Sequence, residues 1–152
     1  MTFTLYMVRH GQTILNSYNR HQGWCDSPLT QKGVNDAKSA GKHLADIKFD
    51  KAYHSDTTRA MRTCHFILEN NQHSQDIVPS ELKNFREQSF GYFEGNDAAQ
   101  TWLMVGALHG CRTYNDILEK YNLGKTRYNY GPESMPVLST YVKIQRTVKK
   151  CS

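Results

Sequence analysis

The chain has 152 residues, of which 38% are apolar and 11% aromatic, and its formal net charge at pH 7 is +5. This length supports one domain with a hydrophobic core, and the composition excludes a disordered chain. No apolar run is long enough to cross a bilayer, and the positive excess lies beyond residue 119 without a recognisable nucleic-acid motif. The sequence therefore predicts a single domain over residues 1–152 that binds neither a membrane nor nucleic acid.

The four cysteines lie far apart and form no C-x-x-C pair: they are Cys25, Cys64, Cys111 and Cys151. This spacing is typical of free thiols in a reducing compartment and differs from that of a disulfide framework or a zinc site. We therefore expect a cytoplasmic protein with no metal ligands among its cysteines.

Strand and helix signals alternate along the first part of the chain. Residues 2–8 have the composition and partial alternation of a strand. Thr30 follows a Ser-Pro-Leu turn and is the expected N-cap of a helix. The buried face of that helix is predicted from apolar or small residues spaced three and four apart, namely Val34, Ala37, Gly41 and Leu44.

A second strand and a second helix follow the same pattern. Residues 49–55 are predicted to form the strand, and Asp56 is the expected cap of the helix after it. The core side of this helix is marked by Ala60, Cys64 and Ile67. Residues 76–82 are predicted as a short third strand, which Pro79 limits.

The rest of the chain is predicted to be mainly helical. Residues 97–121 have helical composition, and a last helix is marked by Val137, Tyr141, Ile144 and Val148. Strands that alternate with helices favour parallel pairing, because each crossover helix returns the chain to the same edge of the sheet. The expected fold is an α/β three-layer sandwich with a mostly parallel sheet.

An Arg-His-Gly turn directly follows the first predicted strand. At the carboxyl end of a parallel strand, Arg9 and His10 are expected to face the crevice in which α/β sheets bind ligands. Gly11 permits close approach of an anion to the backbone, and Thr13 and Asn16 supply hydrogen-bonding groups nearby. The turn is thus predicted to bind an anion.

The second strand ends in a similar way, because Arg59 lies in the first turn of the following helix. Two arginines that converge from adjacent strand ends match the oxygens of a phosphate, and a neutral His10 between them is placed to attack phosphorus. Taken singly, His10 is interpreted as a structural histidine and Arg59 as an ordinary ion-pair partner. Their combination favours a phosphoryl-transfer site.

Four motifs, with a weaker fifth, occur in the order of a known family. They are RHGQTILN (9–16), QGWCDSPLTQKG (22–33), SDTTRAMRT (55–63), FREQSFGYFEG (85–95) and, more weakly, GPES (131–134). On these motifs the chain resembles the histidine phosphatase superfamily, the phosphoglycerate mutase-like proteins. The resemblance covers nearly the whole chain and implies the phosphoglycerate mutase-like fold in a single histidine-phosphatase-like domain.

The resemblance also implies a role for each site residue. His10 would be the nucleophile that forms a phosphohistidine, and Glu87 the acid that protonates the leaving oxygen. The phosphoryl oxygens would be held by Arg9, Asn16, Gln22, Gly23 and Arg59. Glu87 must then have a pKa raised from about 4.3 toward neutrality. No metal or other cofactor is expected, because positioned arginines can replace the magnesium of other phosphoryl-transfer sites.

The motif around Glu87 separates two branches of the family. The mutases resemble E-R-H-Y-G-x-L-Q-G at this point, whereas this chain has REQSFGYFEG at 86–95, which is similar to the phosphatases. The expected function is therefore hydrolysis of a phosphomonoester, with a small phosphorylated metabolite as the substrate. A phosphoglycerate mutase is the less favoured expectation.

The sequence departs from the family pattern near its end. The family carries a second active-site histidine in a V-S-H-G turn after GPES, and the chain reaches residue 152 without it. His109, in MVGALHG, precedes GPES and is expected to be a helix or loop histidine outside the site. The fold is accordingly expected to be C-terminally incomplete, as a fragment, a truncated product or a chain completed by a partner. Whether the chain forms a homodimer is left open by the sequence.

The rival expectation is a module that binds a phosphorylated ligand without turning it over. Such a module needs the arginines but neither a nucleophile nor an acid. The presence of both His10 and Glu87 favours the enzyme.

Overall fold

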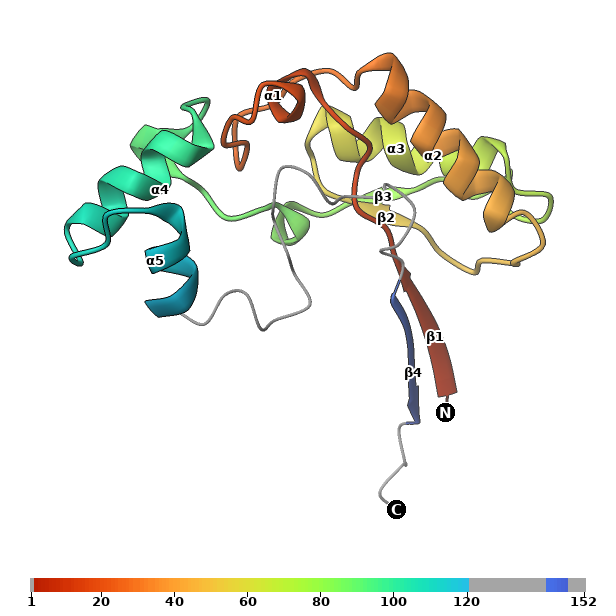
Figure 1. Cartoon of the computed structure of the whole chain (residues 1–152). Coiled ribbons are helices and arrows are strands. Elements are labelled where there is room, and N and C mark those ends of the chain that lie inside the picture. The colour runs from red at the N-terminus through yellow and green to blue at the C-terminus, as the bar shows by residue number, and fades with distance from the viewer. Residues whose placement is uncertain (1, 121–141, 148–152) are drawn as a thin grey trace.

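The computed structural model describes residues 2–120 and 142–147 (Figure 1). In chain order its elements are β1 (Thr2–Met7), α1 (Ile14–Ser17), α2 (Gln31–His43), β2 (Tyr53–His54), α3 (Thr58–Glu69), β3 (Ser80–Glu81), α4 (Ala98–Ala107), α5 (Tyr114–Lys120) and β4 (Val142–Thr147). Two 3₁₀ turns, Lys83–Phe85 and Gly91–Phe93, lie between β3 and α4. The predicted alternation of strands and helices from β1 to β3 is confirmed.

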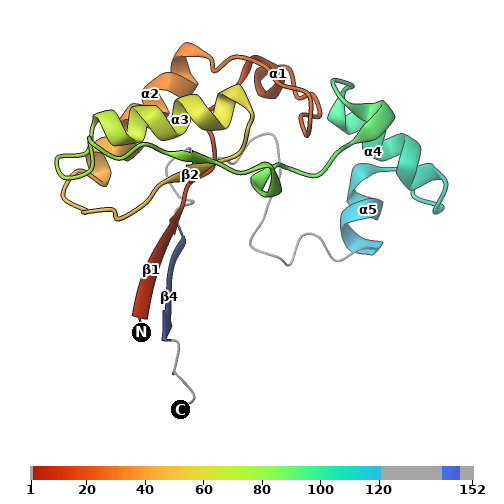
Figure 2. The same ribbon diagram turned by 180° about the vertical axis from the view of Figure 1, so that it is seen from behind.

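Helices α2 and α3 lie side by side on one side of β2 and β3 (Figures 1 and 2). α2 begins at its expected cap, because the Thr30 side chain accepts a hydrogen bond from Gly33 N at 3.1 Å. Its buried residues are Gly33, Ala37 and Gly41, which are small enough for a close approach of the two helices. A Cβ at Gly41 would lie 2.8 Å from Ile67 O, so this contact requires glycine.

The buried face of α3 differs by one position from the prediction. Ile67 is buried as expected, but Ala60 and Cys64 are only half-buried. The buried residues are Arg59, Thr63, Ile67 and Leu68.

Asp56 is not the N-cap of α3 that the sequence predicts. The N-cap is Thr57, without a side-chain hydrogen bond, because the Asp56 carboxylate is paired with Arg86 instead.

β2 and β3 form a parallel ladder, as expected for strands joined through a helix. Tyr53 pairs with Ser80 and His54 with Glu81. Both strands are shorter than the predicted ranges 49–55 and 76–82. Pro79 has no N–H to donate, which fits the late start of β3 at Ser80.

β1 pairs with β4 in an antiparallel ladder that runs to Met7 opposite Val142. The helix expected around Ile144 is therefore wrong, and Val142–Thr147 is a strand. Its apolar residues satisfy a strand period as well as a helical one, and β-branched side chains favour the strand. The other residues of the expected helix lie outside the described part of the chain: Val137, Tyr141 and Val148.

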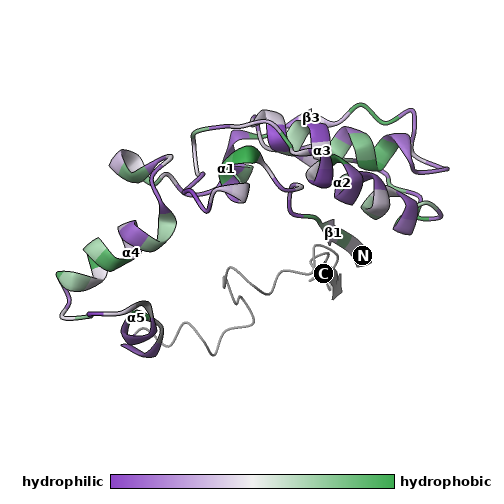
Figure 3. Cartoon of the chain, turned by 45° about the horizontal axis from the view of Figure 1, so that its top comes forward, coloured by the Kyte–Doolittle hydropathy of each residue, from purple (hydrophilic) through white to green (hydrophobic). Residues whose placement is uncertain are grey.

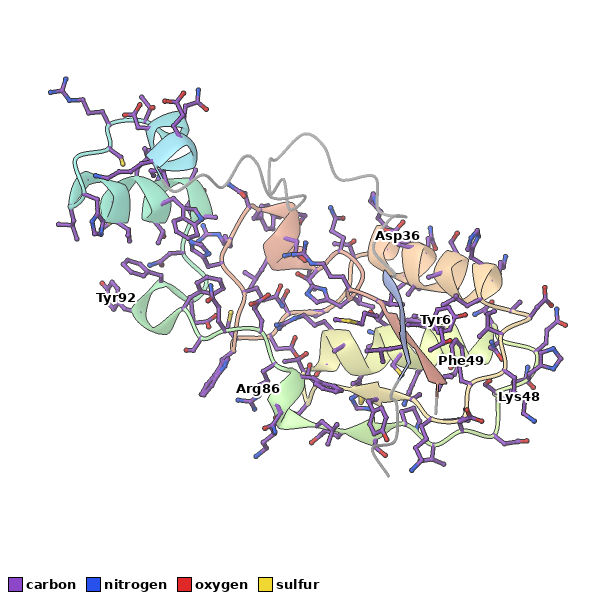
Figure 4. The ribbon with its side chains drawn as sticks, turned by 90° about the horizontal axis from the view of Figure 1, so that it is seen from below. Tyr6, Asp36, Lys48, Phe49, Arg86 and Tyr92 are labelled. Atoms are coloured by element: carbon purple, nitrogen blue, oxygen red, sulfur yellow. The ribbon has the colours of Figure 1, made fainter. Side chains whose placement is uncertain are left out.

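The described strands thus form two ladders, one parallel and one antiparallel. In Figures 1 and 2 the β1–β4 ladder projects away from the layer of α2 and α3. A ring contact links the ladder to the loop between α2 and β2, because Tyr6 meets Phe49 nearly at right angles with centroids 5.6 Å apart (Figure 4). Leu5 and Met7 of β1 are 43% and 52% exposed. The apolar side chains of β1 are therefore only partly covered by the described residues.

α4 and α5 form a separate helical pair at the other side of the molecule (Figures 1 and 2). They confirm that residues 97–121 are mainly helical, and a turn at Gly110, whose φ is +76°, lies between them. Ile117 is buried against Gly106, where a Cβ would lie 2.6 Å from Ile117 Cδ1. Figure 3 shows hydrophobic residues along α4 and hydrophilic ones along α5.

None of the helices in the described ranges is both long and apolar enough to span a lipid bilayer.

Candidate functional site

The Arg-His-Gly turn after β1 is fixed against the first turn of α2 and the second turn of α3. Gly11 N donates to Thr63 Oγ1 at 3.1 Å, and Thr63 Oγ1 donates to Arg59 O at 2.8 Å. A Cβ at Gly11 would lie 2.8 Å from Gly33 C and closer still to Gly33 O, so the two backbones are in direct contact. The glycine predicted for close approach to an anion therefore has a packing role as well.

His10 has a defined tautomer in this turn. Its Nδ1 lies 2.8 Å from Gly11 O. Because a carbonyl oxygen can only accept, Nδ1 carries the proton and Nε2 keeps its lone pair. Burial, together with the smaller effect of the positive charges of Arg59 and Arg9, lowers the pKa of His10 from its usual 6.5 to about 4, against the raising effects of the Gly11 bond and Asp26. The imidazole is therefore neutral at pH 7.

Arg59 is 2% exposed and holds the loop that follows His21. Its Nη2 donates to Gly23 O at 2.7 Å, and its Nη1 donates to Cys25 O at 2.8 Å and to Asp26 Oδ1 at 3.1 Å. Its Nε is buried without a hydrogen-bond partner among the described residues. A buried N–H without an acceptor is uncommon, and here it belongs to a cation beside the neutral His10.

Asp26 ties this loop to the first turn of α3. Thr58 N donates to Asp26 Oδ2 at 2.5 Å, on the other oxygen from Arg59. Burial opposes ionisation of Asp26, but the hydrogen bonds from Thr58 and Arg59 outweigh burial and lower its pKa. Asp26 therefore balances part of the Arg59 charge. It was not among the residues predicted for the site.

Gln22 lies between Thr13 and Arg59. Its amide nitrogen is 2.5 Å from Thr13 Oγ1, and its amide oxygen is 3.1 Å from Arg59 Nη1 and from Ser27 N, which is the orientation that satisfies both ends of the amide. Asn16 uses its side-chain oxygen to accept from Thr13 N at 3.1 Å, as part of a capping box for α1. Its NH₂ group is the end that can donate to an anion.

Glu94 is a structural anchor that the sequence did not identify. Its carboxylate accepts backbone N–H groups at 2.7 to 3.2 Å from four residues: Gly23, Trp24, Cys25 and Phe90. Burial alone would raise the pKa of Glu94, but hydrogen bonds from Cys25 and from the backbone lower it to about 2. The Cys25 thiol in turn stays protonated, because burial and the Glu94 carboxylate raise its pKa to about 11.

Glu87 is exposed and is connected to the loop through its neighbours. Its Oε1 accepts from Gln88 N at 2.9 Å, and its backbone oxygen accepts from Trp24 Nε1 at 3.1 Å. Arg86 lies 5.0 Å from the Trp24 ring centre and also binds Asp56, with Arg86 Nε 2.6 Å from Asp56 Oδ1. Figure 4 shows Arg86 on the segment between β3 and α4.

The structure brings part of the predicted site together. Arg59, Gln22 and Gly23 are in mutual contact beside His10, and Arg9 adds positive charge there. The carboxylate of Glu87 hydrogen-bonds to its own chain neighbour, and His109 lies in the turn after α4, where its N–H donates to Gly106 O. His109 is thus a loop histidine, as the order of the motifs predicts.

Comparison with known proteins identifies the family to which the sequence is similar. A sequence model described as the histidine phosphatase superfamily (branch 1) matches residues 5–115. The chain is 41% identical over 135 residues to a 2,3-bisphosphoglycerate-dependent phosphoglycerate mutase of Pasteurella multocida, with 86% of this chain and 53% of that protein covered. The chain spans about half the length of the curated relatives it matches.

Solved structures show the same fold. The crystal structure of a phosphoglycerate mutase from Bacillus anthracis str. Sterne superimposes with a TM-score of 0.74 at 42% identity, over 78% of this chain and 52% of that one. A mycobacterial glucosyl-3-phosphoglycerate phosphatase, solved in a complex with VO3, superimposes with a TM-score of 0.60 at 30% identity, over 65% of this chain and 46% of that one. The α/β fold of these proteins is therefore the fold of this chain.

Proposed function

Because the chain belongs to the histidine phosphatase superfamily, we propose that it hydrolyses a phosphomonoester through a phosphohistidine at His10. The observation that carries the proposal is the state of the imidazole. Its Nδ1–H is bound to Gly11 O, its Nε2 lone pair is available, and it is neutral beside the buried Arg59. A nucleophile at phosphorus needs this protonation state at neutral pH.

The proposed reaction has two steps. Nε2 of His10 attacks phosphorus and the ester bond breaks, with the leaving oxygen taking a proton from the Glu87 carboxyl group. Water then attacks the phosphohistidine, the P–N bond breaks, and the Glu87 carboxylate accepts a proton from the water. The products are an alcohol and inorganic phosphate, and Glu87 returns to its starting state.

The cations of the site support the proposal without a metal. Arg59 and Arg9 supply positive charge at His10, and the unpartnered Nε of Arg59 is a donor that a phosphoryl oxygen can accept from. Gln22, Gly23 and the NH₂ group of Asn16 complete the proposed set of phosphate contacts. The proposed substrate is a small phosphorylated metabolite.

The test is to trap the phosphohistidine. The full 152-residue chain is mixed with a labelled phosphomonoester, quenched in base and mapped by mass spectrometry. Label is expected on His10 and not on His54, whose Nδ1 lies 2.7 Å from Ser55 O in the same kind of hydrogen bond. His54 therefore controls for the tautomer alone. Phosphate that binds without labelling any histidine would instead support a binding module without turnover.

A second candidate function is a phosphoglycerate mutase. It is favoured by the names of relatives at 41% and 42% identity. The two activities differ in the fate of the phosphoryl group on 3-phosphoglycerate. A hydrolase releases inorganic phosphate, whereas a mutase yields 2-phosphoglycerate, and phosphorus NMR of the reaction distinguishes the two products. The FEG end of the 85–95 motif supports the hydrolase.

We propose the cytoplasm as the location of the protein. Cys25, Cys64 and Cys111 are free thiols in the structure, as the sequence predicts, and Cys151 lies outside the described residues. Three unpaired thiols support a reducing compartment.

A further inference from the structure

The segment that carries Glu87 is held by two contacts with distant parts of the chain. Arg86 binds both oxygens of the Asp56 carboxylate, and its Nε donates to Asp56 Oδ1 at 2.6 Å. The Glu87 carbonyl oxygen accepts from Trp24 Nε1 at 3.1 Å. Arg86 also lies over the Trp24 ring, so the two contacts adjoin each other. The main chain at Glu87, the proposed acid, is therefore restrained by side chains from outside its own segment.

The contact between Asp56 and Arg86 has the geometry of a fixed ion pair. The Asp56 side chain is 9% exposed and that of Arg86 is 30% exposed. Hydrogen bonds from Arg86 hold the pKa of Asp56 below its usual value, and those to Asp56 raise the pKa of Arg86. A contact through two nitrogens and two oxygens fixes orientation as well as distance, unlike most exposed ion pairs. Arg86 is therefore held in one orientation next to Glu87.

The chain that leads to Arg86 is attached to β2 as well. Leu82 N donates to His54 O at 2.8 Å, directly after the β2–β3 ladder. The Phe85 ring meets the ring of Tyr53 nearly at right angles, with centroids 6.3 Å apart. The segment between β3 and Glu87 thus follows β2 and its outgoing turn.

The same contacts attach Glu87 to the parts of the chain that position Arg59. Arg59 donates to the carbonyl oxygens of the two residues on either side of Trp24. Asp56 lies three residues before Arg59, in the turn that enters α3. The contacts therefore form a closed ring, which runs from Arg59 through Trp24 to Glu87 and returns through Arg86 and Asp56.

We propose that Asp56 and Arg86 are positioning residues, which determine where the Glu87 carboxyl group can reach without themselves touching the substrate. The inference rests on the proposed hydrolase function. The Glu87 side chain is exposed, and its carboxylate accepts from the N–H of its own neighbour Gln88. The restraint on the acid thus comes from its main chain. Proton transfer needs hydrogen-bond distance, and a displacement of about 1 Å is costly in rate.

The test uses two esters that differ in their need for an acid. The leaving group of 4-nitrophenyl phosphate departs as a stable anion, whereas the alkoxide of glycerol 2-phosphate must be protonated. The rate constant compared is kcat/KM, because it covers the steps up to departure of the alcohol and excludes hydrolysis of the phosphohistidine. Displacement of the acid lowers kcat/KM for the alkyl ester more than for the aryl ester, whereas general damage to the site lowers both.

Asp56→Asn removes the charge that holds Arg86. We expect its kcat/KM to fall about tenfold for glycerol 2-phosphate and by less than about twofold for 4-nitrophenyl phosphate. Asp36→Asn is the matched control, because it removes the carboxylate of the Lys32–Asp36 ion pair of α2. Both of its kcat/KM values are expected to equal those of wild type.

Trp24→Phe tests the second contact and is independent of the ion pair. It keeps a ring beneath Arg86 and removes the N–H that donates to Glu87 O. We expect the ratio of the two kcat/KM values to shift about threefold in the same direction as in Asp56→Asn. Circular dichroism checks the fold of each variant, and Trp24→Phe, at a residue that is 57% exposed, decides the question if Asp56→Asn does not fold.

The possible outcomes separate the two proposals. A loss confined to the alkyl ester supports the positioning role. Equal losses on the two esters, or no loss on either, in the folded variants would overturn that role while the hydrolase stands. A wild-type chain that hydrolyses neither ester would overturn the hydrolase, and the positioning role with it.

Discussion

At the scale of single residues, the site depends on hydrogen bonds that fix protonation states. The Gly11 carbonyl decides which nitrogen of His10 carries the proton, and burial beside two arginines keeps the ring neutral. Glu94 is held ionised by the backbone N–H groups that donate to its carboxylate. The pKa values of these two groups are shifted in the same direction but for different reasons, since burial lowers one and hydrogen bonding lowers the other.

The lowered pKa of His10 predicts a pH dependence of stability. The unfolded chain binds a proton at His10 below about pH 6.5, whereas the folded chain binds it only near pH 4. The contribution of His10 is therefore present above pH 6.5 and is lost as the pH falls through this window. We expect the stability that wild type loses between neutral pH and about pH 4.5 to exceed the loss in His10→Gln by about 2 kcal/mol.

Urea unfolding of both proteins at the two pH values measures this difference. Other groups that titrate in the window, including His21, are present in both proteins and cancel in the comparison. Parallel curves for wild type and His10→Gln would show that His10 is not held neutral in the fold.

Glu94 predicts a second residue-scale effect. Replacing its carboxylate by an amide in Glu94→Gln leaves one oxygen to accept N–H groups from the loop at Gly23 and turns an NH₂ group toward the others. We expect a loss of about 2 to 4 kcal/mol in the free energy of unfolding, because backbone donors lose a charged acceptor. Urea unfolding of Glu69→Gln, which removes an exposed charge at the end of α3, is the control.

At the scale of elements, the packing of α2 on α3 determines where Arg59 lies. The two helices approach closely because α2 presents glycine and alanine to α3. The same packing places Thr63 of α3 against the His10 turn, where its hydroxyl oxygen accepts from Gly11 N. The position of the cation in the site is therefore a consequence of helix packing that lies away from it.

Gly41→Ala tests this packing. The added Cβ would meet Ile67 O and Asn70 Cβ at 2.8 Å, so the helices must move apart. We expect a destabilisation of about 1 to 3 kcal/mol, measured by thermal or urea unfolding. Ser39→Ala, at an exposed position of the same helix, is the control and is expected to change stability by less than about 0.5 kcal/mol. A stabilising effect of Gly41→Ala, as helix propensity alone would give, would contradict the close contact.

Several features of the helices could be predicted from the sequence alone. The cap at Thr30 and the spacing of small residues on α2 were predictable, because both signals are local to one helix. Asp56 and Glu94 were not predictable, because their partners are 30 and up to 71 residues away in the chain. The strand at Val142–Thr147 was missed because its apolar residues satisfy two periods at once, and only the pairing with β1 decides between them.

At the scale of the whole molecule, the chain divides into the α2–α3 layer with its site, the α4–α5 pair, and the β1–β4 ladder (Figures 1 and 2). The family resemblance predicted the fold from motifs, and the comparisons confirm it. The way in which the strands group into two ladders was not predictable, because strand pairing depends on contacts distant in sequence.

The exposed side of β1 predicts self-association of the chain. Leu5 and Met7 are 43% and 52% exposed on a strand, and such surfaces pair with other apolar surfaces. We expect the apparent mass in sedimentation velocity to rise with protein concentration and the Leu5→Glu variant to reduce that rise. Tyr18→Glu, at a residue that is 68% exposed outside the strand, is the control. A chain that sediments as a monomer at every concentration would contradict the prediction.

The hydrogen bonds of Arg59 have a consequence for ligand affinity. An arginine side chain loses about 2 kcal/mol of rotamer entropy when it is fixed, and here Gly23, Cys25 and Asp26 have already fixed it in the folded chain. An arriving anion therefore meets a guanidinium that does not have to be ordered on binding. The loop that binds the Arg59 guanidinium thus also fixes its orientation for an anion. We therefore expect anion affinity to depend on Asp26, which is not one of the proposed phosphate contacts.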